Sequence, residues 1–326
     1  MDNALLDSVV LPDGILDSSR LSSRETLYIG RNGKAVERFA VDPDDSHSYI
    51  FKPLTNLDTI GREAWVYRNL LPRIPVRYPK LLAQAQHTDA ERYWAIYEDL
   101  GKLEHRFDRE TLIKAAEAIP FWHRLPVESV PEEFTGHTPL VDQIMREIQD
   151  KLPVVRTILE RLAFPADLTE KAQWVVGQMD DRLFSKQTVS HGDYHPLNLS
   201  LLEDQITILD WEYVHRNSIY WDLYNLLDIT SPSYRRPVVT AAVRNEVLQA
   251  YYARTEQLGQ DGGFRTLQQH YYRYALLYSL WILTLIEKDL KSGVLNPEAL
   301  LEQQEETRAI AMDLLLEQIE MNNQPR

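Results

Sequence analysis

Residues 189–212 read VSHGDYHPLNLSLLEDQITILDWE, and this stretch decides the fold. Two apolar runs flank a polar turn, which predicts an antiparallel hairpin centred on Asp204. Asn198 and Asp210 each lie six residues from that centre, so this register places them opposite each other. Directly paired residues have Cα atoms roughly 4.5–5.5 Å apart. Amide and carboxylate oxygens are ligands that Mg²⁺ favours, so the pair predicts a magnesium site.

Asp193 lies five residues before Asn198, on a loop stiffened by Pro196. From there its carboxylate can reach a substrate hydroxyl next to the metal. Protein-kinase active sites have the same order of residues: an aspartate, four intervening residues, a metal-binding asparagine and then a separate metal-binding aspartate. A turn cap would explain Asp193 alone, and a strand end would explain Asp210 alone. Their occurrence together favours catalysis by Asp193.

A lysine and a glutamate in the first hundred residues form a second expected pair. Lys52 ends the apolar strand 49–52, where its ammonium needs a partner. Glu63 follows on a predicted helix and shares an apolar face with Val66 and Leu70. An acid on such a face is costly to bury unpaired, so we expect it to meet Lys52. Two exposed surface charges are the alternative.

The pattern of elements changes near residue 100. Before it, segments 25–30, 35–41, 48–52 and 93–97 are predicted strands, with one helix over 61–71. After it the chain reads mainly as helices, apart from the hairpin around Asp204. The sequence therefore predicts an α+β fold with two lobes: a small, antiparallel-sheet lobe over 1–100 and a larger, mainly helical lobe over 101–326. A cleft between domains is the usual place for a small-molecule site.

The stretch His191–Asn198, followed by Leu209–Glu212, resembles the signature of the aminoglycoside phosphotransferase and choline kinase superfamily. That resemblance implies a protein-kinase-like fold and ATP-dependent phosphotransfer to a hydroxyl of a small molecule. It also implies that Asp193 is the catalytic aspartate and that Asn198 and Asp210 bind Mg²⁺. The similarity is dense over 190–212 and thinner elsewhere.

Two further nucleotide contacts are expected from the small lobe. Gly30 and Gly33 lie in a turn where backbone amides could touch phosphate, although the full pattern of three spaced glycines is not present. Residues 97–101, YEDLG, resemble the hinge between the lobes of that family. The hinge would bring backbone groups of Glu98 and Leu100 to the adenine. A plain exit from a strand is compatible with the same sequence.

Several other residues have simpler interpretations. His191 and His195 are expected to orient the backbone of their loop by hydrogen bonds rather than to bind a metal. Asp222 matches an aspartate that braces the catalytic loop in the resembling family. The aromatic side chains of 271–281 could form a cage for an ammonium ion, but their helical spacing favours a place in the core.

Composition excludes several classes of function. The chain of 326 residues has a formal net charge of −14, which argues against nucleic acid as a partner. It has no cysteine, which excludes disulfides and thiolate metal sites and fits the cytoplasm. No signal peptide is visible at the start, and the apolar stretch 274–286 is too short to span a membrane, so no membrane partner is expected.

We therefore expect a small-molecule kinase that uses ATP and Mg²⁺. Aminoglycosides, choline or ethanolamine, homoserine, methylthioribose and fructosamines are acceptors in the resembling family, and the acidic balance tilts towards an amine-bearing compound. A non-catalytic, nucleotide-binding scaffold is the alternative from another class, and a protein kinase is a third. The acceptor, the choice between ATP and GTP, and the oligomeric state stay open.

Overall fold

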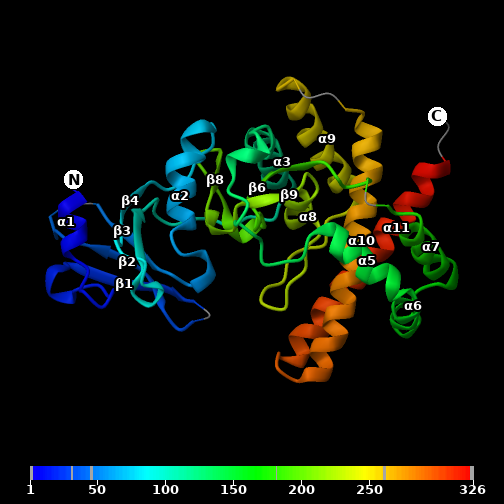
Figure 1. Cartoon of the computed structure of the whole chain (residues 1–326), viewed down its shortest axis with the longest axis horizontal. Coiled ribbons are helices and arrows are strands. Elements are labelled where there is room, and N and C mark those ends of the chain that lie inside the picture. Colours follow the sequence, from blue (N-terminus) through cyan, green and yellow to red (C-terminus); the bar gives the residue numbers. More distant parts are fainter. Residues whose placement is uncertain (1–2, 31, 45–46, 181, 260–261, 324–326) are drawn as a thin grey trace. The chain divides into compact units, whose positions relative to one another are not determined.

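The computed structural model describes residues 3–30, 32–44, 47–180, 182–259 and 262–323 (Figure 1). By its internal contacts the chain divides into two compact units. Unit 1 consists of residues 1–105 and 198–214, and unit 2 of residues 106–197 and 215–326. The boundary between lobes near residue 100 that the sequence indicates stays a prediction.

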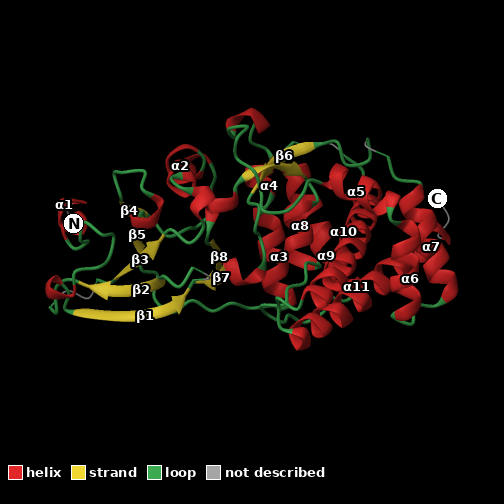
Figure 2. Cartoon of the chain, turned by 60° about the horizontal axis from the view of Figure 1, so that its bottom comes forward, coloured by secondary structure: helices red, strands yellow, loops and turns green. Residues whose placement is uncertain are grey.

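Unit 1 is built on a five-stranded antiparallel sheet (Figure 2). The order across the sheet is β1-β2-β3-β5-β4. The strands are β1 (Ser23–Ile29), β2 (Ala35–Ala40), β3 (Tyr49–Pro53), β4 (Leu81–Gln84) and β5 (Trp94–Glu98). The strands predicted over 25–30, 35–41, 48–52 and 93–97 are confirmed, with small shifts at their ends; β4 was not predicted.

The two faces of this sheet have different roles. Phe39 and Phe51 lie on one face, in a buried cluster with Leu6 of α1 (Asn3–Ser8) and Val9 just after that helix. Successive side chains of a strand point to opposite faces. Lys52 therefore extends from the face opposite that cluster.

A helix and a hairpin complete unit 1. Helix α2 (Arg62–Asn69) begins after Gly61, which adopts a left-handed conformation, and it lies against the 3-10 helix η7 (Trp211–Tyr213). The hairpin consists of β7 (Leu199–Leu202) and β8 (Gln205–Ile208).

The register of that hairpin differs by one residue from the expected one. Leu202 pairs with Gln205, so the turn contains only Glu203 and Asp204, both with positive φ. Such two-residue turns match the twist of the strands they join. Asn198 consequently stands opposite Leu209, whose N–H donates to the Asn198 carbonyl at 2.9 Å. The predicted pairing of Asn198 with Asp210 is wrong.

Unit 2 is mainly helical. Its strands β6 (Gln187–Ser190) and β9 (His215–Ser218) form a two-stranded antiparallel sheet. Its helices are α3 (Arg109–Ala118), α4 (Pro120–His123), α5 (Val141–Asp150), α6 (Leu152–Arg161), α7 (Ala166–Gly177), α8 (Trp221–Leu227), α9 (Ala241–Gln257), α10 (Phe264–Ser292) and α11 (Pro297–Asn323). Further single-turn 3-10 helices of the chain are Ser18–Arg20, Leu57–Thr59, Leu71–Arg73, Ala90–Arg92, Val127–Ser129 and Pro196–Asn198.

Helix α10 forms the centre of unit 2 and packs along α11 (Figure 1). The stretch 274–286 lies within α10 and is mostly buried, as the sequence indicated. The aromatic side chains of residues 271–281 in the same helix are also buried, which confirms their place in the core: Tyr271, Tyr272, Tyr274, Tyr278 and Trp281. Among the described residues, no helix combines the length and the apolar character needed to cross a membrane.

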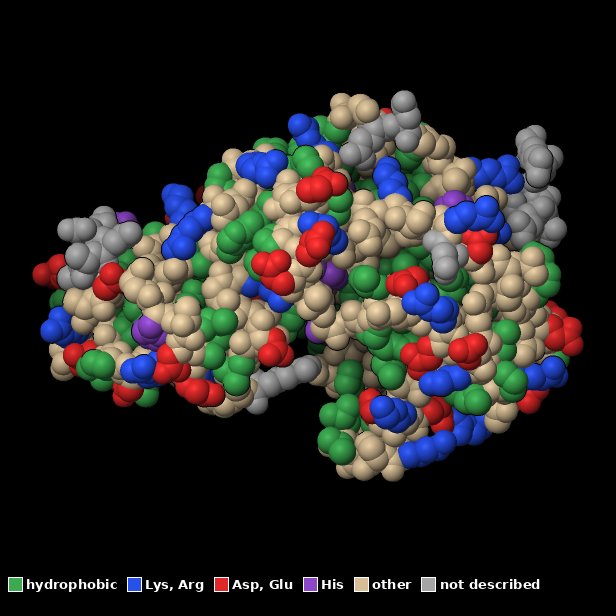
Figure 3. Space-filling view, viewed as in Figure 1, with side chains coloured by type: hydrophobic (Ala, Val, Ile, Leu, Met, Phe, Trp, Pro, Cys, Tyr) green, Lys and Arg blue, Asp and Glu red, His purple; other side chains and the backbone are tan. Residues whose placement is uncertain are grey.

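The excess of acidic residues does not form a single acidic patch on the face of the molecule that Figure 3 shows. On the face drawn in Figure 3, acidic and basic side chains are interspersed. Several charged side chains of the described residues are paired on their own helix, as Arg146 is with Asp142 and Lys151 with Glu147. Such pairs contribute little to stability but keep the surface polar.

Candidate active site

Lys52 is the centre of a charged cluster in unit 1. Its Nζ lies 3.1 Å from Glu63 Oε2, 2.5 Å from Asp210 Oδ1 and 3.9 Å from Glu212 Oε2. Burial alone would lower the pKa of Lys52, but Asp210, Glu63 and Glu212 together raise it well above its usual value. The lysine is therefore a fixed cation, and its predicted pairing with Glu63 is confirmed.

The three acids around Lys52 also meet one another. Glu63, Asp210 and Glu212 each offer a carboxylate oxygen, and these atoms all lie within 4.8 Å of one another. Hard divalent cations such as Mg²⁺ prefer oxygen ligands of this kind, so the donor set fits a metal ion. Glu212 was not predicted as a site residue, although its place two residues after Asp210 could have indicated it.

Backbone geometry and a buried arginine hold the acids in place. Asp210 has φ 59°, in the left-handed region, and it precedes the first turn of η7. Arg62, at the start of α2, is almost fully buried; burial lowers its pKa, and the charge of Glu212 opposes that shift. Asn56 Nδ2 donates a hydrogen bond of 3.0 Å to the hydroxyl of Tyr213. Residues just before and at the start of α2 are thus linked to η7.

In unit 2, a buried aspartate organises the loop that carries Asp193. The carboxylate of Asp222 accepts hydrogen bonds from the loop and from α4; the donors are Ser190 Oγ (2.7 Å), His191 N (3.0 Å), Gly192 N (3.2 Å), Trp122 Nε1 (2.8 Å) and His123 Nε2 (3.1 Å). Burial alone would raise the pKa of Asp222, but His123, His191 and Ser190 hold it well below its usual value. The interpretation of Asp222 as a brace is confirmed.

Histidines surround the carboxylate of Asp193. Its Oδ2 lies 3.4 Å from Nε2 of His195. Burial alone would raise the pKa of Asp193, but the hydrogen bond and charge of His195, with the charges of His137 and His191, lower it to about 2. Asp193 is thus a charged carboxylate at neutral pH, and its low pKa makes it a weak base.

Two of these histidines also orient the loop backbone, as predicted. His191 Nδ1 accepts the N–H of Asp193 at 3.3 Å, and His195 Nδ1 accepts the N–H of Leu197 at 3.2 Å. The ring of Tyr234 packs on the imidazole of His195, with centroids 5.3 Å apart. His137 and Tyr234 were not predicted as site residues, because each lies far from Asp193 in the sequence.

The other expected nucleotide contacts stay predictions. The N–H of Gly30 donates to the Lys34 carbonyl at 2.8 Å, and that of Gly33 donates to the Gly30 carbonyl at 2.9 Å. Both glycine amides therefore stabilise the β1–β2 turn itself. Glu98 N–H donates to the Lys80 carbonyl at 2.9 Å as β5 ends, just before Leu100.

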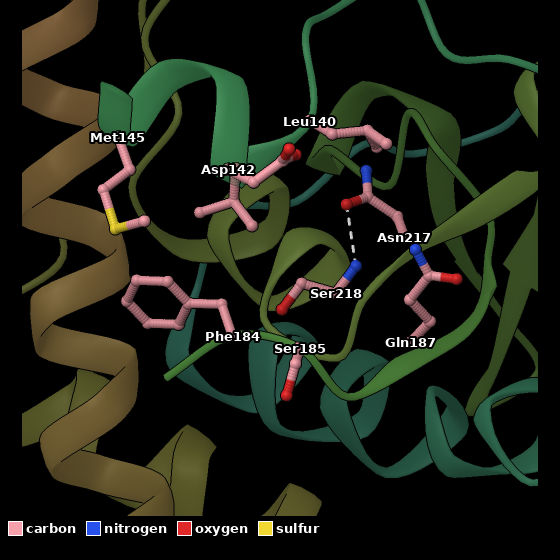
Figure 4. A pocket seen from close by; sticks show the side chains of 9 residues that line it. Leu140, Asp142, Met145, Phe184, Ser185, Gln187, Asn217 and Ser218 are labelled. Carbon is pink, nitrogen blue, oxygen red and sulfur yellow. Dashed lines mark hydrogen bonds between the residues drawn. The ribbon is translucent and has the colours of Figure 1, made fainter. Parts of the chain in front are cut away.

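A cavity of about 170 Å³ lies at one end of the β6–β9 sheet (Figure 4). Residues of α5, the segment before β6 and the end of β9 line it, among them Asp142, Met145, Phe184, Asn217 and Ser218. Gln187 pairs with Ser218 at this end, whereas Ser190 pairs with His215 at the other end. The Asp193 loop leaves β6 after Ser190, so the cavity lies about 10 Å along the strands from the start of that loop.

Comparison with known proteins identifies the family. Residues 32–258 match the model of the phosphotransferase enzyme family. No curated protein matches the chain. An aminoglycoside phosphotransferase from Alicyclobacillus acidocaldarius is 13% identical, with a TM-score of 0.59 over 98% of this chain and 96% of that one. The streptomycin–ATP complex of the aminoglycoside phosphotransferase APH(2″)-IIa is 14% identical, with a TM-score of 0.54 over 90% of this chain and 94% of that one.

A choline kinase from Cryptosporidium parvum is 11% identical, with a TM-score of 0.56 over 98% of this chain and 96% of that one. These identities are low, so the three structures show a shared fold. They confirm the predicted α+β, kinase-like fold with its antiparallel-sheet and helical parts. The family match spans well over half of the sequence and includes Lys52, Asp193 and Asp210. The chain therefore belongs to the phosphotransferase enzyme family and is a small-molecule kinase.

Proposed function

We propose that the protein transfers the γ-phosphoryl group of ATP to a hydroxyl of a small molecule. The observation that carries this proposal is the cluster of Lys52 with Glu63, Asp210 and Glu212. A cation flanked by closely spaced carboxylates suits a triphosphate bound together with a metal ion. A solved structural neighbour that holds ATP supports this choice of nucleotide.

Each site residue has a role in this reaction. Lys52, steadied by Glu63, would hold the phosphates of the nucleotide. Asp210, with Asn198, would hold Mg²⁺, and Glu212 completes the acidic group. Bound Mg²⁺ neutralises charge on the phosphates.

Asp193 would orient the acceptor hydroxyl for in-line attack on the γ-phosphorus. The oxygen–phosphorus bond to the acceptor forms as the bond to ADP breaks, and the hydroxyl proton passes to the Asp193 carboxylate. A carboxyl with a pKa of about 2 is a weak base. Orientation is therefore the main contribution of Asp193, in keeping with a reaction in which positioning and charge neutralisation dominate.

The acceptor is proposed to bear an amine as well as a hydroxyl, on the strength of the net charge of −14. Aminoglycoside and choline kinases among the fold neighbours have amine-bearing substrates by name. The groups that shift the pKa of Asp193 are histidines rather than acids. Histidines, unlike acids, do not favour an amine beside Asp193. Acceptors without an amine, such as neutral sugars, should therefore be assayed together with the amine-bearing ones.

The lack of cysteine fits the cytoplasm, where we propose that the reaction takes place.

A non-catalytic scaffold is the competing function. ADP release with Mg²⁺ and ATP, measured across amino alcohols, aminoglycosides and sugars, separates the two. Release that depends on one acceptor and disappears in Asp193→Asn supports the kinase and names its substrate class. Tight binding of ATP with no release on any acceptor would instead support the scaffold.

A further inference from the structure

His195 contacts the catalytic carboxylate directly. Its Nε2 lies 3.4 Å from Asp193 Oδ2, slightly longer than the roughly 2.7–3.2 Å that is typical of an N–H···O hydrogen bond. Both side chains are mostly buried, with 15% of His195 and 21% of Asp193 exposed. They come from one loop of unit 2, two residues apart.

The hydrogen bonds of His195 assign its proton. Nδ1 accepts the N–H of Leu197 at 3.2 Å, so this nitrogen carries the lone pair. In a neutral imidazole the other nitrogen then carries the hydrogen. Nε2 is thus a donor in both the neutral and the charged form of the ring, and its partner is Asp193 Oδ2.

Tyr234 holds the imidazole in this orientation. The two ring centroids are 5.3 Å apart with an interplanar angle of 35°. Burial, with a further contribution from the charge of Asp193, raises the pKa of Tyr234 to about 12. The phenol therefore stays neutral and adds no negative charge beside the carboxylate.

Two more histidines face Asp193. His191 lies on the same loop, and His137 comes from the segment between α4 and α5. That segment is pinned at Gly136, where a Cβ atom would lie only 2.7 Å from the ring of His215. His215 pairs with Ser190 at the start of the loop, which explains how His137 reaches the carboxylate.

We propose that His195 is a positioning residue for the transfer reaction. Its Nε2–H donor holds one oxygen of Asp193, so that the other oxygen meets the acceptor hydroxyl in line with the γ-phosphorus. Tyr234 in turn holds the imidazole. This inference rests on the proposed function and adds no chemical step to it.

The same contact predicts how the protonation of Asp193 changes without His195. The hydrogen bond and charge of His195 oppose the effect of burial on Asp193. His191 and His137 are still present in His195→Ala, but the largest opposing contribution is lost. The pKa of Asp193 should therefore rise from about 2 towards the ordinary aspartate range.

Two measurements on the full-length protein test the inference. The first is carboxyl ¹³C NMR of Asp193 between pH 3.5 and 7, with the resonance assigned from Asp193→Asn. The wild-type Asp193 carboxyl should show no protonation step of its own in this range. In His195→Ala the protonation step of Asp193 should enter this range, and His195→Gln, which keeps an N–H donor, should lie between the two.

The second measurement is steady-state kinetics. His195→Ala should lower kcat roughly 10- to 100-fold, as is usual when the residue that orients a reacting group is removed. The KM for ATP should stay within about two-fold, and His195→Gln should recover part of kcat. His87→Ala, at an exposed histidine of unit 1, is the matched control and should behave as wild type.

The outcomes separate this inference from the proposed function. NMR needs no turnover, so an unshifted Asp193 titration in His195→Ala would overturn the role of His195 even if the enzyme is an active kinase. Unchanged kcat in His195→Ala would overturn it as well. A raised Asp193 pKa in a protein that phosphorylates no acceptor would support the contact and contradict the proposed function instead.

Discussion

The ammonium of Lys52 lies 2.5 Å from the carboxylate of Asp210, closer than the 3.1 Å that separates it from Glu63. Residues far apart in the sequence are thus joined by one ion pair inside unit 1. The same cation lies 3.9 Å from Glu212, so its charge balances a group of three acids. Removing it would leave those acids facing one another at close range, because their nearest oxygens are within 4.8 Å.

Lys52→Met should therefore destabilise unit 1 by about 3 kcal/mol, since it breaks a mostly buried ionic group. Millimolar Mg²⁺ should restore part of that loss, because the cation replaces the missing charge. Urea unfolding with and without MgCl₂ measures both effects. Lys80→Met is the control, because the Lys80 side chain is 75% exposed. Equal losses in the two variants, or no response to Mg²⁺, would contradict the account of the cluster.

Asp193→Asn should lower kcat by roughly 10²- to 10⁴-fold while leaving the KM for ATP nearly unchanged. The amide can no longer hold the acceptor hydroxyl through a charged oxygen, whereas the Lys52 cluster is untouched. Steady-state kinetics on the acceptor found in the panel measures this. Asp180→Asn, at a surface aspartate paired with Arg182, should keep wild-type rates. Near wild-type turnover in Asp193→Asn would remove this residue from the mechanism.

Asp222→Ala should cost about 3–5 kcal/mol of unfolding free energy, because it leaves buried donors of the loop and α4 without their acceptor. Asp142→Ala, at an exposed i,i+4 pair with Arg146, should cost less than about 1 kcal/mol. Urea unfolding of both variants at pH 7 is the measurement. A loss in Asp222→Ala as small as that of the control would show that the brace has little effect on stability.

The pH dependence of stability gives a separate test of Asp222. Its pKa is held well below the unfolded value of about 4. Its stabilising effect is therefore fully present above pH 4 and is lost as the pH falls through the folded-state pKa. The stability difference between wild type and Asp222→Asn should shrink as the pH drops below 4. A constant difference between pH 7 and pH 3 would contradict the low pKa.

Replacing Glu203 by Asn and Asp204 by Gly should stabilise the protein by about 0.5–1 kcal/mol without changing turnover. Both residues have positive φ, at 49° and 65°, and Asn-Gly adopts that turn with less strain. Thermal unfolding and kinetics of the double variant measure this. A loss of stability would indicate that the turn needs another conformation, and with it another register of β7 and β8.

The sequence predicted the Lys52–Glu63 pair because Lys52 ends an apolar strand and Glu63 lies on an apolar helix face, so each charge needs a partner. It did not predict the register of β7 and β8. The polar turn was placed around Asp204, whereas the two positive φ angles at Glu203 and Asp204 shorten the turn by one residue. Sequence patterns indicate which segments form strands more reliably than they indicate turn conformation.

Contacts between residues far apart in the sequence could not be predicted either. Nothing local in the sequence brings His137 or Tyr234 to the Asp193 loop, because each lies on a different connecting segment of unit 2. Glu212 is a different case, because it lies only two residues after Asp210, a predicted metal ligand. Predicting it as a site residue would have required only the conformation of η7, which turns its carboxylate back towards Lys52.

The division of unit 1 into two pieces of chain has a consequence for biosynthesis. Residues 198–214 belong to the same unit as residues 1–105, and Ile208 N–H bonds to the carbonyl of Arg77. A nascent chain released from the ribosome up to residue 197 therefore lacks the carboxylates that neutralise Lys52 on its inner side. The strands of the five-stranded sheet are all present by residue 98, but Lys52 has only Glu63 of its three acidic partners until more than 100 further residues have been translated. The rate of translation through this interval thus sets how long the sheet of unit 1 stays without the hairpin and η7 that complete the unit.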